Sequence, residues 1–333
     1  MDHEHIAYDI AIIGGGVVGF AGAMYAGRLG MKTLVLSEMT GGTIILTDVV
    51  ENYPGFKRLT GQELADNIQE HAMDYGANLV EEKAIKIVKC SESCYSIFTE
   101  SQSFHAKTIL FATGAKHREL GIPGEKEFAN KGVHSCALCD GPIYKEKTVA
   151  VVGGSDSAAK EALVLAKWAK KVYIVYRGEK IRAEPVNMRR VEQKISEGKI
   201  EIINNTNVNE IHGAGRVEYV ILDREYSGSK KFMIDAVFVE IGMIPNSQLA
   251  QSLGIATNSK MEIVINRKAE ANLPGIFAAG DVADMEFKQA ITGVGEAVAA
   301  VYSAYRYVNE NEFICACNDE EFEKSIIQYG KGK

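Results

Sequence analysis

The chain has 333 residues and a mass of 36.3 kDa, which is enough for about two domains with full hydrophobic cores. Hydrophobic residues make up 46% of it and charged residues 24%, a balance that excludes an intrinsically disordered chain. The 37 basic and 44 acidic residues give a net charge of −7, which argues against nucleic acid or an anionic membrane as a partner. No apolar run approaches membrane-spanning length, and the acidic N-terminal segment is unlike a signal peptide. We therefore expect a cytoplasmic protein with no nucleic-acid or membrane partner.

A first glycine-rich turn follows the apolar segment 8–13, which is suited to a buried parallel strand. Gly14 allows the tight turn, Gly16 lets the backbone approach a pyrophosphate, and Gly19 lets the following helix pack on the strand. The N-terminus of that helix then faces the phosphate charge. A second apolar segment leads to Glu38, where a carboxylate can bind ribose hydroxyls. The pattern predicts a site for FAD or NAD, and the alternative is a glycine turn that only packs a helix.

The same unit is repeated in the middle of the chain. The apolar segment 148–152 leads into a second turn and helix, whose candidate nucleotide-binding residues are Gly153, Gly154, Ser155 and Ser157. Arg177 follows Gly153 at the distance at which Glu38 follows Gly14. A cation at this register suits a ribose 2′-phosphate, and Arg182 is placed to be a second contact. The second site is therefore predicted to prefer NADPH.

Two further apolar segments end in turns that favour a flavin at the first site. Residues 109–115 include Thr113 and Gly114, and residues 275–282 end in Gly280 and Asp281. A carboxylate in such a turn can bind hydroxyls while backbone amides reach phosphate. Each segment alone is equally compatible with an ordinary turn.

The cysteine pair Cys136 and Cys139, followed by Asp140, carries the most reactive chemistry in the chain. Two thiols at this spacing at the start of a helix form a reducible disulfide, because the helix N-terminus stabilises a thiolate. Asp140 is placed to move a proton. The alternatives are half of a zinc site and two inert core thiols.

Four other cysteines bear on that choice, since a zinc site needs a second pair of ligands. Cys90 and Cys94 form one candidate pair, and Cys315 and Cys317 form another, but their spacings are irregular. We therefore expect a redox pair at 136 and 139, no metal, and four incidental thiols. A shuttle role for Cys315 and Cys317 is the alternative for the last two.

Taken together, these motifs resemble the low-molecular-weight thioredoxin reductases over nearly the whole chain, from about residue 8 to residue 308. The matching motifs occur in that family's order. They are Gly41-Gly42, the segment 50–55, the Ala-Thr-Gly-Ala turn 112–115, the segment 136–141, Gly280-Asp281 and the segment 288–292.

The resemblance implies an α/β fold of two Rossmann-like dinucleotide-binding domains, with the NADPH domain inserted into the FAD domain. The FAD domain would comprise residues 1–116 and 246–333, and the NADPH domain, with the cysteine pair, residues 117–245. Hinges would lie at 114–117 and 244–245. The resemblance also implies a homodimer whose electron acceptor is a thioredoxin-like protein.

Site residues are implied for each cofactor. Beyond the residues of the first turn and Glu38, the FAD contacts would be Gly41, Gly42, Thr43, Asn52, Thr113, Gly114, Gly280, Asp281, Gln289 and Ala290. The NADPH contacts would be Gly153, Gly154, Ser155, Ser157, Arg177 and Arg182. Cys136, Cys139 and Asp140 would form the active site.

The mechanism implied is electron transfer from NADPH through FAD to the Cys136–Cys139 disulfide, and from there to thioredoxin. Cys139 would face the flavin, Cys136 would attack the thioredoxin disulfide, and Asp140 would serve as proton donor or base. Nicotinamide and disulfide would take turns at the flavin through a domain rotation.

Five positions depart from the family pattern: Thr43 replaces a glutamine, Ser155 a glycine, Lys160 an acid, Tyr176 a histidine and Gly178 an arginine. Ser155 and Gly178 weaken the NADPH site and keep two related functions open. These are a dithiol oxidase of the same fold and a reductase with another electron donor, such as a deazaflavin or ferredoxin. A nucleotide-sensing module without enzymatic activity is a third alternative, but it would have no need of the cysteine pair.

Overall fold

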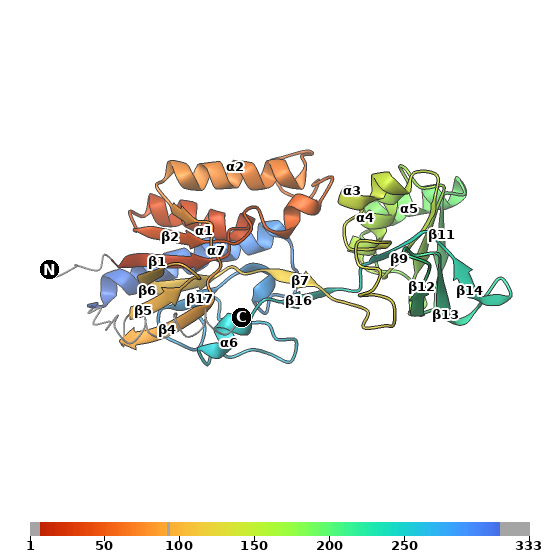
Figure 1. Ribbon diagram of the computed structural model, residues 1–333. Helices are drawn as coiled ribbons and strands as arrows, with labels where there is room; N and C mark the ends of the chain where they lie inside the picture. Colours follow the sequence, from red (N-terminus) through yellow and green to blue (C-terminus); the bar gives the residue numbers. More distant parts are fainter. Residues whose placement is uncertain (1–6, 92–93, 314–333) are drawn as a thin grey trace. The chain divides into compact units, whose positions relative to one another are not determined.

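The computed structural model describes residues 7–91 and 94–313 (Figure 1). The predictions for Cys315 and Cys317 lie outside these residues. The chain divides into two compact units, with boundaries between Ala115 and Lys116 and between Ile244 and Pro245. Unit 1 contains the segments before the first boundary and after the second, and unit 2 is the segment between them.

Unit 1 is built on a seven-stranded sheet with the order β3-β2-β1-β6-β5-β4, and β17 pairs with β6 beside β5. Strands β3, β2, β1, β6 and β17 are parallel, whereas β4, β5 and β6 form an antiparallel meander. The strand bounds are β1 Tyr8–Ile13, β2 Thr33–Leu36, β3 Asn78–Val80, β4 Lys86–Ser91, β5 Cys94–Phe98, β6 Ser103–Phe111 and β17 Ile276–Ala278.

The helices of unit 1 bury the apolar faces of this sheet. Phe20 of α1 and Val301 of α7 lie in one core cluster with Ile10, Ile12 and Leu110 of the sheet, and all five side chains are fully buried. Figure 1 shows α2 running along the outer side of α1. The bounds are α1 Val17–Arg28, η1 Thr43–Leu46, α2 Gly61–Asp74, α6 Gln248–Ser252, η3 Gly280–Val282 and α7 Ala290–Glu310.

Unit 2 has a five-stranded parallel sheet in the order β11-β10-β9-β15-β8 and a separate antiparallel sheet β12-β13-β14. Its strands are β8 Val133–His134, β9 Thr148–Val152, β10 Lys171–Val175, β11 Ile200–Ile203, β12 Val208–His212, β13 Tyr219–Tyr226, β14 Ser229–Met233 and β15 Ala236–Val239. Its helices are α3 Ala137–Asp140, η2 Gly141–Tyr144, α4 Asp156–Leu165 and α5 Pro185–Ser196. Each unit thus contains a strand-turn-helix-strand repeat in a parallel sheet, the arrangement of a Rossmann-like fold.

The chain passes between the units in β7 (Ala115–His117) and again in β16 (Met243–Pro245), and these two short strands pair with each other. The two crossings are therefore adjacent in space, although more than a hundred residues separate them in the sequence.

Candidate active site

The first glycine turn connects β1 to α1, and its backbone requires glycine. Gly14 has a φ of +114°, and a Cβ there would lie 2.3 Å from the carbonyl oxygen of Ala112. A Cβ on Gly19 would lie 1.9 Å from the oxygen of Gly14, so this glycine lets α1 pack against the turn. No side-chain oxygen caps the start of α1, where Gly16 is the N-cap residue. The helix therefore presents backbone N–H groups that an anion can accept, and the turn fits a pyrophosphate.

Other predicted residues gather around the start of α1. Gly41 donates its N–H to the oxygen of Gly15 at 2.8 Å and forms a parallel bridge with Gly16. A Cβ on Gly280 would meet the side chain of Val18 at 3.0 Å. Segments that are far apart in the sequence are thus brought to one helix N-terminus, with Thr43 opening η1 directly after Gly42.

Two predicted residues more than two hundred positions apart contact each other directly. Asn52 donates its side-chain N–H to Oε1 of Gln289 at 2.9 Å. Gln289 caps α7, and Ala290, the first residue of that helix, packs on the apolar cluster that includes Val17 of α1. The 50–55 and 288–292 segments therefore reach the same end of α1.

The two predicted carboxylates have different surroundings. Glu38 follows β2 and forms an ion pair of 2.8 Å with Lys83, in which both side chains are about two-thirds exposed. Burial raises the pKa of Asp281, and the charge of Lys288 partly opposes that shift. Glu38 is thus accessible to a ligand hydroxyl, while Asp281 is held in a less solvated place.

The Ala-Thr-Gly-Ala turn is fixed by a residue that the sequence analysis missed. Thr113 Oγ1 donates to the oxygen of Asn246 at 2.7 Å, and Asn246 Nδ2 donates back to the oxygen of Thr113 at 2.9 Å. The N–H of Asn246 also donates to the oxygen of Gly114, which has a φ of +61°. Asn246 therefore joins the two chain segments next to the unit boundaries, and its position directly after Pro245 was the available signal.

The second glycine turn connects β9 to α4 in unit 2. A Cβ on Gly153 would lie 2.1 Å from the oxygen of Glu240, so a side chain is excluded there. The ring of Tyr176 covers Gly154, because a Cβ on Gly154 would lie 2.3 Å from it, and the same ring packs beside Gly178. Tyr176 therefore fills space over the turn.

Ser155 is the N-cap residue of α4, and its Oγ accepts the N–H of Ala158 at a long 3.5 Å. This weak contact occupies one backbone amide at the start of α4, whereas no side chain caps the corresponding amides of α1 in unit 1. Ser157 in the first turn of α4 and the two arginines, Arg177 and Arg182, are exposed. The backbone N–H of Arg182 donates to the oxygen of Gly154 at 2.7 Å, which places it beside the turn. These residues retain the anion-binding features of the turn, with less free space than in unit 1.

The cysteine pair forms a disulfide at the start of α3, with 5.4 Å between the Cα atoms of Cys136 and Cys139. Cys136 is 6% exposed, and its Sγ accepts the N–H of Cys139 at 3.1 Å. Cys139 is exposed. A backbone N–H directed at sulfur stabilises a thiolate once the disulfide is opened.

Asp140 is oriented by a buried histidine that the sequence analysis did not single out. His134 Nδ1 lies 3.0 Å from Oδ2 of Asp140, and its Nε2 lies 2.8 Å from the hydroxyl of Tyr144. Its ring stacks on Phe238. Burial lowers the pKa of His134, and the charge of Asp140 and its contact with the ring partly oppose that shift. The arrangement holds a carboxylate next to the disulfide, where a proton is needed.

Two buried carboxyl groups lie behind the disulfide turn and were also missed. Oε2 of Glu161 on α4 accepts the N–H of Ala137, and burial raises the pKa of Glu161 to about 7. Burial, with the charge of Glu161, raises the pKa of Glu240 to about 8. The sequence offered one indication of a role for Glu161: the family has two acidic residues in this helix, and Glu161 is the one retained beside Lys160.

Comparison with known proteins matches these features to one family. Residues 8–302 match the family described as pyridine nucleotide-disulphide oxidoreductase. The chain is 37% identical to the thioredoxin reductase of Bacillus subtilis over 321 residues, which cover 93% of this chain and 97% of that protein. It is 38% identical to the thioredoxin reductase of Listeria innocua, with the same coverage of both chains.

Solved structures agree with the sequence relatives. The thioredoxin reductase of Lactococcus lactis superposes with a TM-score of 0.86 at 35% identity and covers 91% of this chain and 100% of that one. The thioredoxin reductase of T. acidophilum gives 0.84 at 32% identity, with 90% and 98% covered.

The chain therefore belongs to the pyridine nucleotide-disulphide oxidoreductases and, within them, to the thioredoxin reductases. The predicted resemblance and the α/β fold class are confirmed, and the protein is an oxidoreductase. Among residues 7–91 and 94–313, no helix combines the length and the apolar character that crossing a membrane requires.

Proposed function

We propose that this protein is an NADPH-dependent thioredoxin reductase that uses FAD and reduces a thioredoxin-like protein through Cys136 and Cys139. The observation that carries the proposal is the disulfide at the start of α3, with Asp140 beside it, in the same unit as a glycine turn for a dinucleotide. Family membership supports the same assignment.

Unit 1 is proposed as the FAD domain and unit 2 as the NADPH domain. The uncapped start of α1, the contact between Asn52 and Gln289, and the turn held by Thr113 support a flavin dinucleotide in unit 1. A flavin bound there would supply the redox chemistry that links a nicotinamide donor to a disulfide acceptor. The paired strands β7 and β16 are proposed as the hinge of a domain rotation. That rotation would bring the nicotinamide and the disulfide to the flavin in turn.

The protein's own residues complete the exchange. Once the pair is reduced, the thiolate of Cys136 attacks the thioredoxin disulfide and forms a mixed disulfide, which expels one thioredoxin thiolate. The thiolate of Cys139 then attacks the sulfur of Cys136, so the Cys136–Cys139 disulfide forms again and the second thioredoxin thiolate leaves. Asp140, held against His134, donates a proton to the leaving sulfur. Two electrons are thereby passed to thioredoxin in each cycle.

NADPH as the donor rests on the positions of Arg177 and Arg182. Both are exposed, and a guanidinium at this register can bind a 2′-phosphate. Ser155, which caps α4, and Tyr176, which covers Gly154, leave less free space at this turn than the turn of unit 1 has. The cytoplasmic location and the homodimer remain predictions.

A coupled assay tests the function: NADPH, purified flavoprotein and oxidised thioredoxin are mixed, and thioredoxin dithiol is measured. We expect dithiol to form in proportion to NADPH consumed, with no activity in a Cys136→Ser/Cys139→Ser double variant. Consumption of oxygen at the expense of added dithiols, without NADPH oxidation, would instead identify a dithiol oxidase.

A further inference from the structure

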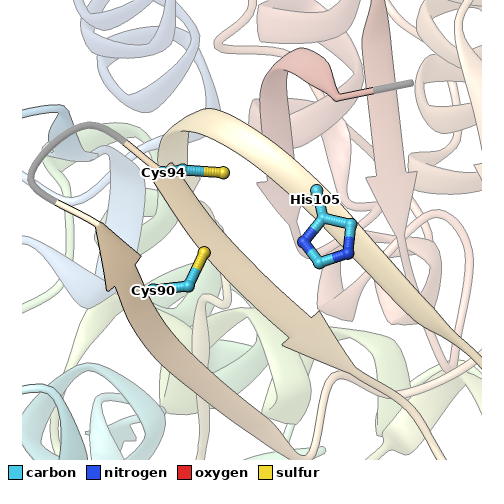
Figure 2. Close-up of side chains that lie close together, drawn as sticks. All are labelled: Cys90, Cys94 and His105. Atoms are coloured by element: carbon cyan, nitrogen blue, oxygen red, sulfur yellow. The ribbon is translucent and has the colours of Figure 1, made fainter. Parts of the chain in front are cut away.

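A second group of sulfur and nitrogen atoms lies in unit 1, among residues to which the proposed reaction assigns no role. Cys90 at the end of β4, Cys94 at the start of β5 and His105 on β6 place one ligand atom each within 4.8 Å of one another. Figure 2 shows both sulfur atoms and the imidazole ring facing the same space. Cys94 is fully buried, and His105 is 6% exposed.

Strand pairing explains how three separated positions meet. Ser96 of β5 lies opposite His105 of β6, and Cys94 lies two residues before Ser96, so Cys94 and His105 are diagonal neighbours on one face of the sheet. Between β4 and β5 the register shifts, because Lys89 pairs with Tyr95 but Ser91 pairs with Cys94. Cys90 is the extra residue of this bulge, and a bulge redirects a side chain. Because Cys90 follows Lys89, which pairs with Tyr95, Cys90 lies next to Cys94 on the face that also carries His105.

Ser96 also fixes the imidazole ring. Its Oγ lies 3.1 Å from Nδ1 of His105. Metal-binding histidines are commonly oriented in this way by a neighbouring polar group. The orientation of the ring is therefore set before any ligand arrives.

Two thiols and an imidazole are the ligands that thiophilic metals prefer. Tetrahedral zinc with bonds of about 2.0 to 2.3 Å holds such ligand atoms roughly 3.5 to 3.8 Å apart. The three ligand atoms here all lie within 4.8 Å of one another, which is compatible with that spacing after small side-chain rotations. Both cysteines are disulfide-bonded in the structure, so their sulfur atoms become metal ligands only after reduction to thiols. A disulfide makes no use of the imidazole, whereas a metal does.

We propose that, after a dithiol has reduced the disulfide bonds of Cys90 and Cys94 by thiol–disulfide exchange and has itself become a disulfide, these two thiols and His105 bind one thiophilic metal ion, Zn²⁺ or iron. Each thiol loses its proton on binding, and a further ligand completes the coordination. The ion links β4, β5 and β6, and β4 is the outer strand of this meander. The site therefore stabilises the edge of the unit 1 sheet.

The test begins with protein purified anaerobically under reducing conditions without chelators, followed by analysis for zinc, iron and acid-labile sulfide. We expect about one metal site per chain in the wild type and less than about a tenth of that in Cys90→Ser and His105→Gln. The matched control is the Cys136→Ser/Cys139→Ser double variant, which also removes thiols but keeps the metal. Zinc without acid-labile sulfide identifies a Zn²⁺ site, and iron in place of zinc identifies an iron site.

A second measurement keeps the proposal testable if a variant folds poorly. Co²⁺ added to metal-free wild-type protein should give a thiolate-to-cobalt absorption band and raise the thermal midpoint, and it should do neither in His105→Gln that retains its flavin. Wild-type protein that holds no metal and shows no cobalt band would overturn the proposal. Metal content unchanged in both single variants would also overturn it.

Discussion

Glu161 accepts the backbone N–H of Ala137 at 2.5 Å and so connects α4, the helix after the second glycine turn, to the turn that carries the disulfide. Ala137 lies directly after Cys136, and the Glu161 carboxyl is buried. The proposed nucleotide turn and the redox pair thus share one structural element, and the pKa of this carboxyl bears on the stability of both.

The first prediction concerns pH and stability. The raised pKa values of Glu161, about 7, and Glu240, about 8, mean that the folded state keeps protons that the unfolded state releases near pH 4.5. The free energy of unfolding should therefore fall as pH rises from about 5 to 8. Glu161→Gln and Glu240→Gln should each flatten that fall, as measured by urea unfolding of the holoenzyme at several pH values. Glu192→Gln, an exposed position on α5, is the control that should leave the slope unchanged. An unaltered slope in both buried variants would contradict the assignment.

Asp140→Asn should slow reduction of thioredoxin about 10² to 10⁴-fold, because the proton donor to the leaving thiolate is lost. The rate at which NADPH reduces the flavin should stay within about twofold, since that step needs no proton from Asp140. Stopped-flow absorbance separates the two rates. Equal losses in both would show that the substitution acts on the fold of the turn.

Gly16→Ala tests the flavin site without disturbing the turn. A Cβ there would lie 3.6 Å from Cα of Gly42, an ordinary contact, so the chain should fold. The methyl group would face the predicted pyrophosphate, and FAD affinity should fall at least about tenfold. Gly19→Ala places a Cβ 1.9 Å from the Gly14 oxygen and should destabilise unit 1 itself. Full flavin content in Gly16→Ala at low FAD concentration would contradict the assignment of the FAD pyrophosphate to this turn.

Arg177→Ala should raise the KM for NADPH at least about tenfold and leave that for NADH nearly unchanged. An arginine–phosphate contact contributes about 1.5 to 3 kcal/mol, and NADH lacks the phosphate. Arg224→Ala, an exposed arginine on β13, serves as the matched control. Identical kinetics with both nucleotides in the wild type would remove Arg177 from nucleotide selection and favour another electron donor.

A residue's role could be predicted from the sequence when the constraint on it comes from its neighbours in the chain. Gly14 and Gly153 were recognisable because a tight turn against a neighbouring carbonyl excludes a side chain at one position. Cys136 and Cys139 were recognisable because their spacing alone brings the sulfurs together. Residues whose role depends on tertiary packing gave no such pattern: His134 acts through a carboxylate six positions away.

The group of Cys90, Cys94 and His105 shows the same limit. The irregular spacing of Cys90 and Cys94 matches no metal motif and predicts incidental thiols. His105 joins them only through the pairing of β5 with β6, and Cys90 meets Cys94 through the pairing of β4 with β5, neither of which composition or periodicity indicates.

The most direct measurement of the central claim is anaerobic stopped-flow absorbance on the wild type and the two single variants, Cys136→Ser and Cys139→Ser. In the wild type, NADPH should bleach the flavin and oxidised thioredoxin should restore its absorbance. Both variants should keep the bleaching and lose the restoration, because hydride transfer needs neither sulfur. Only Cys136→Ser should show a long-wavelength band, from the remaining Cys139 thiolate beside the flavin. Restoration by thioredoxin in either variant, or no bleaching by NADPH in the wild type, would contradict an NADPH-dependent reductase that works through this disulfide.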